Sequence, residues 1–287
     1  MQAAARLAAA RGKKIAIVPT MGALHEGHQS LIKRAVKEAD VVITTIFVNP
    51  AQFAPHEDLA KYPRDEKNDL QKIEAALGRR KASGIVFMPK VADIYPEGFQ
   101  TWVDVVELTD TLEGARRPGH FKGVTTVVSK LFNICRPDIA VFGMKDFQQA
   151  VVLKRMTHDL GYPIKYVIAP TVREADGLAL SSRNVYLDAG ARQRAVALAR
   201  SLQVAVDLFR SGERDGAALA AAARAVLDAE PGLATDYAAC IDPATFAPAA
   251  RAGHACVVAV AARLGATRLI DNVVLGEGLE GDGRLAG

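Results

Sequence analysis

The sequence predicts an α/β protein: a doubly wound parallel sheet followed by a smaller α+β domain. Three observations predict this class. Short apolar segments alternate with amphipathic helical segments through the first two-thirds of the 287-residue chain. One of them, VVITTIFV at 41–48, is a β-branched run typical of a strand buried on both faces of a sheet. Polar, glycine-bearing motifs follow the predicted strands, at the edge where such sheets bind ligands.

The elements of the first part follow in regular order. Because the first fourteen residues are rich in alanine and arginine, they predict an amphipathic helix before the first strand. Apolar residues then recur at helical or strand spacing in turn. Strands are expected at 15–18, 41–48, 84–88, 139–142 and 166–168, and helices at 29–39, 65–77, 124–135 and 148–160.

The pattern changes near Leu187. Asp188 is suited to cap one long helix over 191–209, and a second, alanine-rich helix is expected over 217–229. Three strands are expected at 237–241, 255–262 and 268–275, and the glycine-rich tail from 276 onward is expected to be loose. The sequence therefore predicts a domain over 1–187 and a small α+β domain over 188–287.

Composition excludes several classes of protein. Half of the residues are hydrophobic and a quarter charged, as in ordinary globular domains, and the net charge of +4 does not indicate a nucleic-acid partner. No apolar run reaches the roughly eighteen residues of a membrane span, and the N-terminus makes a poor signal peptide. The three cysteines are far apart, as expected of reduced, buried thiols. We expect a cytoplasmic protein.

The motif PTMGALHEGH at 19–28 joins the first strand to the next helix. Gly22 and Gly27 allow the backbone to approach a ligand closely, and the helix that follows directs free N–H groups toward it. His25 and His28 can both face that point. The motif predicts a phosphate-binding turn.

Two other readings of these histidines stay open. A helical zinc motif would need histidines four residues apart with a glutamate between them, whereas here they are three apart across a glycine. They could also be ordinary turn histidines without a ligand.

Three further motifs lie after predicted strands or in loops on the same side. NPAQF at 49–53 offers amides that can hold a small polar substrate, and a YPR segment precedes the helix that carries Asp69. GMKDFQQ at 143–149 places Lys145 at a strand-to-helix turn, where a cation can bind phosphate. LSSRN at 180–184 offers hydroxyls and a guanidinium that suit a triphosphate.

Together, these segments resemble the pantothenate synthetase family, the pantoate–β-alanine ligases. The matching segments are PTMGALHEGH, FVNPAQF, EDLAKYPR, FGMKDFQQ, VREADGLALSSRN and RLIDNVVL, in order from residue 19 to 275. The H-x-G-H turn alone is also similar to that of class I aminoacyl-tRNA synthetases and other nucleotidyltransferases, whereas the ordered set is specific.

The resemblance implies a Rossmann-like, nucleotidyltransferase-type sheet that binds ATP and pantoate, with the C-terminal domain as a lid. It implies condensation of (R)-pantoate with β-alanine through a pantoyl-adenylate, releasing AMP and diphosphate in pantothenate and coenzyme A biosynthesis. ATP and Mg²⁺ would be required, and a homodimer is usual in the family.

The resemblance also implies roles for individual residues. His28 would be the proton donor, acting with His25, Lys145 and Arg183. The ATP site would comprise Met21, Gly22, Ala23, Leu24, His25, Glu26, Gly27, His28, Gly143, Met144, Lys145, Asp146, Val172, Leu180, Ser181, Ser182 and Arg183. Gln52, Gln149, Asn49 and Tyr62 would bind the substrates, and Asp69 would hold Mg²⁺. Asn68 and Lys72 flank Asp69 where acidic or amide residues occur in the family.

Three alternatives remain: a nucleotidyltransferase that stops after transferring AMP or CMP to a phosphorylated acceptor, a tRNA-binding synthetase relative, and an inactive binding protein. The glutamine pair favours a small carboxylate over a phosphorylated acceptor. The alanine-rich C-terminal part lacks the basic surface that tRNA binding needs. The intact histidine, lysine and arginine set argues against an inactive protein.

Overall fold

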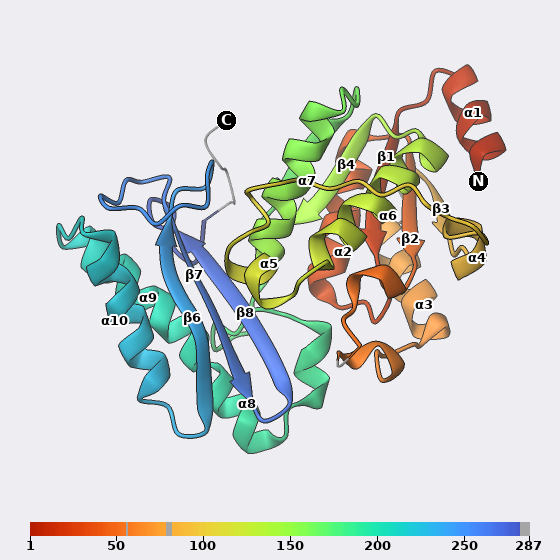
Figure 1. Ribbon diagram of the computed structural model, residues 1–287. Helices are drawn as coiled ribbons and strands as arrows, with labels where there is room; N and C mark the ends of the chain where they lie inside the picture. The colour runs from red at the N-terminus through yellow and green to blue at the C-terminus, as the bar shows by residue number, and fades with distance from the viewer. Residues whose placement is uncertain (56, 79–81, 282–287) are drawn as a thin grey trace. The chain divides into compact units, whose positions relative to one another are not determined.

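The computed structural model describes residues 1–55, 57–78 and 82–281 (Figure 1). Its chain forms two units, each with its own core. The first comprises Met1–Gly143 and Gln148–Ala169, and the second comprises Met144–Phe147 and Pro170–Gly287. None of the helices in the described ranges is long and apolar enough to cross a membrane.

A five-stranded parallel sheet forms the centre of the first unit. Its strands are β1 (Ile15–Thr20), β2 (Val41–Ile46), β3 (Ser83–Phe87), β4 (Ile139–Gly143) and β5 (Lys165–Ala169), in the order β3-β2-β1-β4-β5. All four pairings are parallel. From β1 the chain adds β2 and β3 on one side of the sheet and then β4 and β5 on the other, so the predicted doubly wound sheet is confirmed. The carboxyl ends of β1 and β4 form its switch point.

Helices cover both faces because the strands are apolar on both faces. Ile15 and Ile17 of β1 pack into one core with α1 (Gln2–Ala10), α6 (His120–Cys135) and α7 (Phe147–Asp159). The alternate residues Ala16 and Val18 pack into the other core with α2 (Glu26–Glu38) and α3 (Glu66–Leu77). This period of two is what a strand requires when both of its faces are buried.

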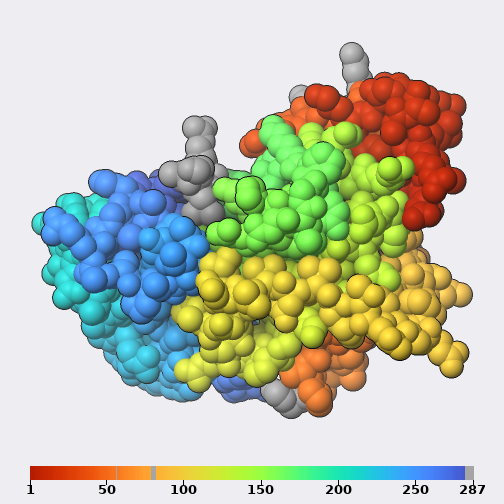
Figure 2. Space-filling view, turned by 45° about the horizontal axis from the view of Figure 1, so that its top comes forward, coloured from red at the N-terminus to blue at the C-terminus, as the bar shows by residue number. Residues whose placement is uncertain are grey.

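Several short elements were not predicted. They are the 3₁₀ helices η1 (Pro50–Gln52) and η2 (Asp58–Ala60) and the helices α4 (Val91–Ile94) and α5 (Leu112–Arg116). One or two turns carry too few residues to show a hydrophobic period. Between α4 and α6 the chain runs along the surface of the unit as the yellow band in Figure 2, and its Trp102 and Val106 side chains are exposed.

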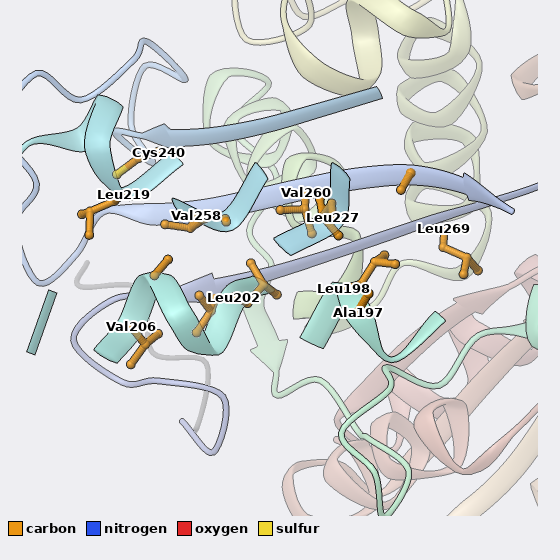
Figure 3. Packing of buried hydrophobic residues seen from close by; sticks show 14 of the residues in the cluster. Ala197, Leu198, Leu202, Val206, Leu219, Leu227, Cys240, Val258, Val260 and Leu269 are labelled. Carbon is orange, nitrogen blue, oxygen red and sulfur yellow. The ribbon is translucent and has the colours of Figure 1, made fainter. Parts of the chain in front are cut away.

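The second unit is built on an antiparallel sheet. Strands β6 (Leu233–Ile241), β7 (Val257–Leu264) and β8 (Thr267–Val274) pair in that order, and α9 (Ala197–Arg210) and α10 (Gly216–Asp228) pack against them. Leu198, Leu202 and Val206 of α9 face side chains of the sheet in this core (Figure 3). The smaller α+β domain is therefore confirmed.

Two predicted features of this region differ in detail. The single helix expected over 191–209 is two helices, α8 (Ala189–Ala195) and α9, because the Val196 N–H bonds to the Gln193 carbonyl three residues back and interrupts the α-helical register. The described part of the tail is held by hydrogen bonds: the Gly276 N–H, for example, donates to the His254 carbonyl at 2.8 Å. Residues 282–287 of the tail lie outside the described ranges.

The second unit begins earlier than the predicted domain boundary at 187. Residues 170–187 belong to it because Leu178 lies in its core and Arg173 pairs with Asp271. The turn at 144–147 also belongs to this unit. The 3₁₀ helices η3 (Met144–Asp146) and η4 (Ser182–Tyr186), which carry Lys145 and Arg183, are therefore both parts of the second unit.

Candidate active site

The turn after β1 bends tightly at Gly22. This residue has a φ of +81°, and a Cβ atom there would lie 2.9 Å from the Asp69 carboxylate and 3.2 Å from Ile46. A side chain would therefore be strained in conformation and crowded in space. Ala23 also has a positive φ of 51°. Glycine is required at position 22 because the turn wraps closely around a buried carboxylate.

Asp69 on α3 holds this turn. Its side chain is 2% exposed, and its two oxygens accept hydrogen bonds from the Ala23 N–H at 2.9 Å and the Leu24 N–H at 2.7 Å. The Lys72 ammonium, one helical turn later, donates to the Leu24 carbonyl at 2.6 Å. Helix α3 therefore fixes both donors and an acceptor of the turn after β1.

These contacts do not fit the expected role of Asp69 in holding Mg²⁺. Both carboxylate oxygens bind main-chain amides in a buried position, and an ammonium lies on the same turn. Mg²⁺ prefers octahedral oxygen ligands and keeps several waters. Within the described ranges no group of three histidine, cysteine, aspartate or glutamate residues could hold a metal ion. Asp69 is therefore a residue that holds the turn through its two main-chain hydrogen bonds.

The two histidines lie together where α2 begins. The His25 N–H donates to His28 Nδ1 at 3.3 Å, and the two ring centroids are 4.1 Å apart. Because Nδ1 of His28 accepts this bond, the proton of the neutral ring is on Nε2. A ring N–H beside the N-terminus of a helix is suited to bind phosphate oxygens.

Gln52 lies beside this turn. It is 9% exposed, and its Nε2 is 3.3 Å from the Met21 sulfur. Its Oε1 accepts a hydrogen bond from Asn49 Nδ2 at 2.9 Å, which fixes the orientation of the amide. The N–H groups of Gln52, rather than its oxygen, are thus directed to the side of Met21. A donor is what a substrate carboxylate requires.

Tyr95 fixes the orientation of Asn49 in turn. Its hydroxyl donates to Asn49 Oδ1 at 2.8 Å, and Asn49 Nδ2 also donates to the Gly123 carbonyl at 3.1 Å. Burial raises the pKa of Tyr95 to about 12, although the hydrogen bond to Asn49 opposes the shift. The hydroxyl therefore keeps its proton at neutral pH and remains a donor.

A second set of side chains supports the main chain of Gln52. His120 Nδ1 donates to the Gln52 carbonyl at 2.9 Å, and Arg117 Nη1 donates to His120 Nε2 at 3.1 Å. Burial and, to a smaller extent, the Arg117 charge lower the pKa of His120 to about 4, so the ring is neutral. Arg117 also pairs with Glu57 at 2.6 Å. Burial alone would raise the pKa of Glu57, but the hydrogen bond and charge of Arg117 lower it overall.

Sequence reasoning missed Tyr95, Arg117 and His120, because nothing near them in the sequence indicates contact with Asn49 or Gln52. Of the other expected substrate residues, Tyr62 is buried with its ring edge-on to Phe53 at 5.9 Å. Gln149 is half-buried on α7. The structure brings neither of these two into a hydrogen bond with Gln52 among the described contacts.

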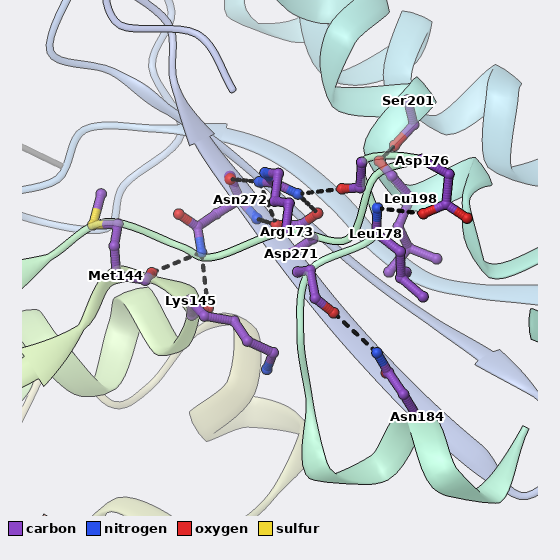
Figure 4. A network of polar contacts seen from close by, with 12 residues as sticks. Met144, Lys145, Arg173, Asp176, Leu178, Asn184, Leu198, Ser201, Asp271 and Asn272 are labelled. Atoms are coloured by element: carbon purple, nitrogen blue, oxygen red, sulfur yellow. Dashed lines mark hydrogen bonds and ion pairs between the residues drawn. The ribbon is translucent and has the colours of Figure 1, made fainter. Parts of the chain in front are cut away.

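The remaining expected ATP residues lie in the second unit, apart from Gly143 at the end of β4. The Lys145 side chain is 19% exposed, with Nζ 3.7 Å from an Asp146 oxygen. The Leu180 N–H donates to the Val172 carbonyl at 3.0 Å, which closes a hairpin, and Ser181 Oγ accepts from the Arg183 N–H at 3.2 Å. Strand β8 supports these loops through Asp271 and Asn272 (Figure 4), two residues to which the sequence analysis gave no role.

Comparisons with known proteins give a consistent result. The family model described as pantoate-beta-alanine ligase matches residues 1–274. The chain is 52% identical over 261 residues to the pantothenate synthetase of Roseiflexus castenholzii, covering 91% of this chain and 92% of that one. It is 50% identical over 277 residues to the pantothenate synthetase of Geobacter sulfurreducens, covering 96% of each.

Solved structures agree with the sequence comparisons. The crystal structure of pantothenate synthetase from Thermus thermophilus matches with a TM-score of 0.87 and 44% identity, covering 91% of this chain and 93% of that one. The pantoate-beta-alanine ligase of Francisella tularensis, crystallised with beta-gamma ATP and beta-alanine, matches with a TM-score of 0.73 and 34% identity, covering 94% and 93%.

Proposed function

Because the chain belongs to the pantoate–β-alanine ligase family, we propose that it condenses (R)-pantoate with β-alanine through a pantoyl-adenylate. It is a ligase that uses ATP. AMP and diphosphate are the other products, and the reaction serves pantothenate and coenzyme A biosynthesis. The observation that carries the proposal is the Gln52 amide, which presents N–H donors beside Met21 of the histidine turn.

In the first step the pantoate carboxylate attacks the α-phosphorus of ATP, and diphosphate leaves. Gln52 holds the pantoate and aligns it for attack. Negative charge grows on the phosphate oxygens and on the departing diphosphate. His28 acts as proton donor, and His25, Lys145 and Arg183 offset the charge by fixed donors that need no reorganisation during the reaction.

In the second step the β-alanine amine attacks the carbonyl carbon of the mixed anhydride and a C–N bond forms. AMP leaves with the pair of electrons from the broken C–O bond, and the nitrogen releases one proton to solvent. The amine must be unprotonated to attack. Gln149, Asn49 and Tyr62 are proposed to contact the acids, and Val172 the base or ribose of ATP. The C-terminal domain is proposed to act as a lid against hydrolysis of the adenylate.

Mg²⁺, a cytoplasmic location and a homodimer complete the proposal. Mg²⁺ is proposed on the chemistry of ATP phosphates alone, since Asp69 is engaged elsewhere. The cytoplasm suits the three free cysteines, of which Cys135 and Cys240 are buried. A two-fold dimer is the commonest assembly of soluble proteins, and light scattering on the purified protein tests it.

The deciding experiment measures diphosphate release from ATP with pantoate alone and then with β-alanine added. We expect a stoichiometric burst with pantoate and sustained turnover only with both acids, giving AMP and an amide. Adenylyl transfer to a phosphate ester without amide formation would establish the nucleotidyltransferase alternative instead. No burst with pantoate would contradict the assignment of Gln52.

A further inference from the structure

Strand β8 carries two polar residues in an otherwise apolar stretch, and the chemistry above does not use either of them. Asp271 is 2% exposed and Asn272 is 5% exposed. They belong to the RLIDNVVL motif, which is far in sequence from every residue proposed to bind ATP. A strand interior that buries an acid and an amide needs a reason, because burial of polar groups is unfavourable unless they are hydrogen-bonded.

Asn272 binds the main chain that carries Lys145. Its Nδ2 donates to the Met144 carbonyl at 3.0 Å and to the Lys145 carbonyl at 2.9 Å (Figure 4). Its Oδ1 is buried without a hydrogen-bond partner among the described atoms. A reversed amide would place that oxygen against two carbonyl oxygens, so the observed orientation is fixed. The side chain therefore keeps both donors on this turn although its own acceptor stays unpaired.

Asp271 holds the second loop. Its oxygens accept from both terminal nitrogens of Arg173, at 2.6 and 2.9 Å, in a bidentate pair. Arg173 Nη1 also donates to the Gly177 carbonyl at 3.0 Å, inside the hairpin that begins at Val172. The pair is almost fully buried, with exposed side-chain fractions of 12% for the arginine and 1% for the aspartate. The hairpin that leads to Ser181 and Arg183 is thus tied to the same strand.

We propose that Asp271 and Asn272 are positioning residues that hold the two proposed nucleotide-binding loops from adjacent places on β8. Asn272 fixes the position of the Lys145 main chain. Asp271 pairs with Arg173 and so fixes the position of the hairpin that precedes Arg183. Neither is a catalytic residue, since the Asn272 amide nitrogen and both Asp271 oxygens bind protein groups. This inference rests on the proposed function, in which Lys145 and Arg183 bind ATP.

The test is a double-mutant cycle on ATP binding, measured by calorimetry with ATP alone. Asn272→Asp keeps the shape of the side chain but directs an oxygen at the two carbonyls, and we expect a rise of at least about tenfold in Kd, or about 1.4 kcal/mol. In a Lys145→Ala background the same substitution should change Kd by no more than about twofold, because the group that it positions is gone.

Asp236→Asn is the matched control. Asp236 on β6 accepts from Arg268 Nε on β8 at 2.6 Å, so this variant breaks another carboxylate–arginine contact of the same sheet away from both loops. It should leave the Kd for ATP unchanged. Asn272→Ser keeps one hydrogen-bond donor and should weaken ATP binding less than Asn272→Asp. It replaces Asn272→Asp in the experiment if the aspartate variant does not fold.

The inference is overturned if folded Asn272 variants bind ATP like the control, or if the loss is equally large without the Lys145 side chain. A wild-type protein that makes pantothenate while the Asn272 variants behave like the control would overturn this inference and leave the proposed function standing. A wild-type protein that binds no ATP would contradict both.

Discussion

Asp69 is a carboxylate whose role depends on what surrounds it. The family resemblance implies a metal ligand at this position, whereas in the fold Asp69 accepts hydrogen bonds from the Ala23 and Leu24 N–H groups of the turn after β1. These contacts are therefore typical of a helix side chain that fixes the conformation of a neighbouring loop. The distinction can be measured, because a metal ligand and a loop anchor respond differently to Mg²⁺ concentration.

Asp69→Asn should lower the free energy of unfolding by about 1.5–3 kcal/mol, the range for hydrogen bonds to a charged group. One amide N–H of the turn would then face an NH₂ group. We expect kcat/KM for ATP to fall. The Mg²⁺ concentration that gives half of the maximal rate should stay the same. Urea unfolding and diphosphate release at several Mg²⁺ concentrations measure the two effects.

Asp65→Asn is the matched control for this variant. Asp65 makes the same chemical type of contact at the start of the same helix, where it caps the Asn68 N–H at 3.1 Å. Asparagine is an equally good capping residue, so stability and activity should stay near those of the wild type. A large shift in the Mg²⁺ requirement of Asp69→Asn would restore the metal-ligand assignment.

His120 makes the stability of the protein depend on pH. The folded ring has a pKa of about 4 in place of 6.5, because it is buried and lies beside the positive charge of Arg117. Between these values the unfolded chain binds a proton that the folded chain does not. The contribution to stability is therefore complete above pH 6.5 and is lost as the pH falls toward 4, by about 3 kcal/mol in total.

His120→Gln keeps a donor for the Gln52 carbonyl and does not titrate. Urea unfolding between pH 7.5 and pH 4 should show that the wild type loses more stability than this variant. The pH-dependent contributions of carboxylates that both proteins share cancel in the difference. The pKa of Glu57 is held below 4.5, so its stabilisation is lost only as the pH falls below about 4.5, at the acid end of this window. Parallel stability curves for the two proteins would show that folding does not lower the pKa of His120.

At the scale of elements, helix α6 approaches η1 very closely at Gly123. A Cβ atom there would lie 2.3 Å from the Ala51 carbonyl oxygen and 2.7 Å from the Gln52 nitrogen. Both are main-chain atoms, so the overlap cannot be relieved by a side-chain rotation. The glycine therefore allows the helix to sit against the segment that carries Gln52.

Gly123→Ala should destabilise the protein, by about 1–3 kcal/mol, even though alanine is the better helix former by about 1 kcal/mol. Because the overlap falls on the Gln52 main chain, KM for pantoate should rise as well. Gly190→Ala in α8 is the matched control, since a Cβ atom there meets its nearest neighbours at 3.4 Å. Thermal unfolding and steady-state kinetics compare the two, and a stabilised Gly123→Ala would show that α6 can shift away.

The elements themselves were largely predictable. Strands of the parallel sheet and the long helices have a clear hydrophobic period, and each of the eight strands in the described ranges lies where an apolar segment predicted it. The short helices α4 and α5 and the break at Val196 were missed. These depend on local hydrogen bonds, such as that between Val196 and Gln193, which leave no periodic pattern in the sequence.

At the scale of the whole molecule, each of the two units has its own apolar core. In the second unit Leu202 is fully buried on α9 (Figure 3), between helix and sheet. Leu202→Ala removes part of that core and should destabilise this unit by about 2–5 kcal/mol. Hydrogen exchange of the amides in β6, β7 and β8 should accelerate accordingly.

Val204→Ala controls for the loss of helix side chains, because Val204 lies two residues away on the same helix and is 40% exposed. Its effect should stay within about 0.5 kcal/mol. Equal exchange rates in the two variants would mean that Leu202 is not a central core residue of the unit.

The sequence by itself determined the fold class, the strands and the family resemblance, and it pointed to the loops that are proposed to bind ATP and the substrates. Those features depend on residues close together in the chain: a period of two or 3.6, or a motif such as PTMGALHEGH. Only the tertiary structure decided what supports those loops. Asp69 reaches the turn from 46 residues away, and Asn272 reaches Lys145 from 127. Hydrogen bonds over such separations follow from how elements pack, and no spacing in the sequence records them.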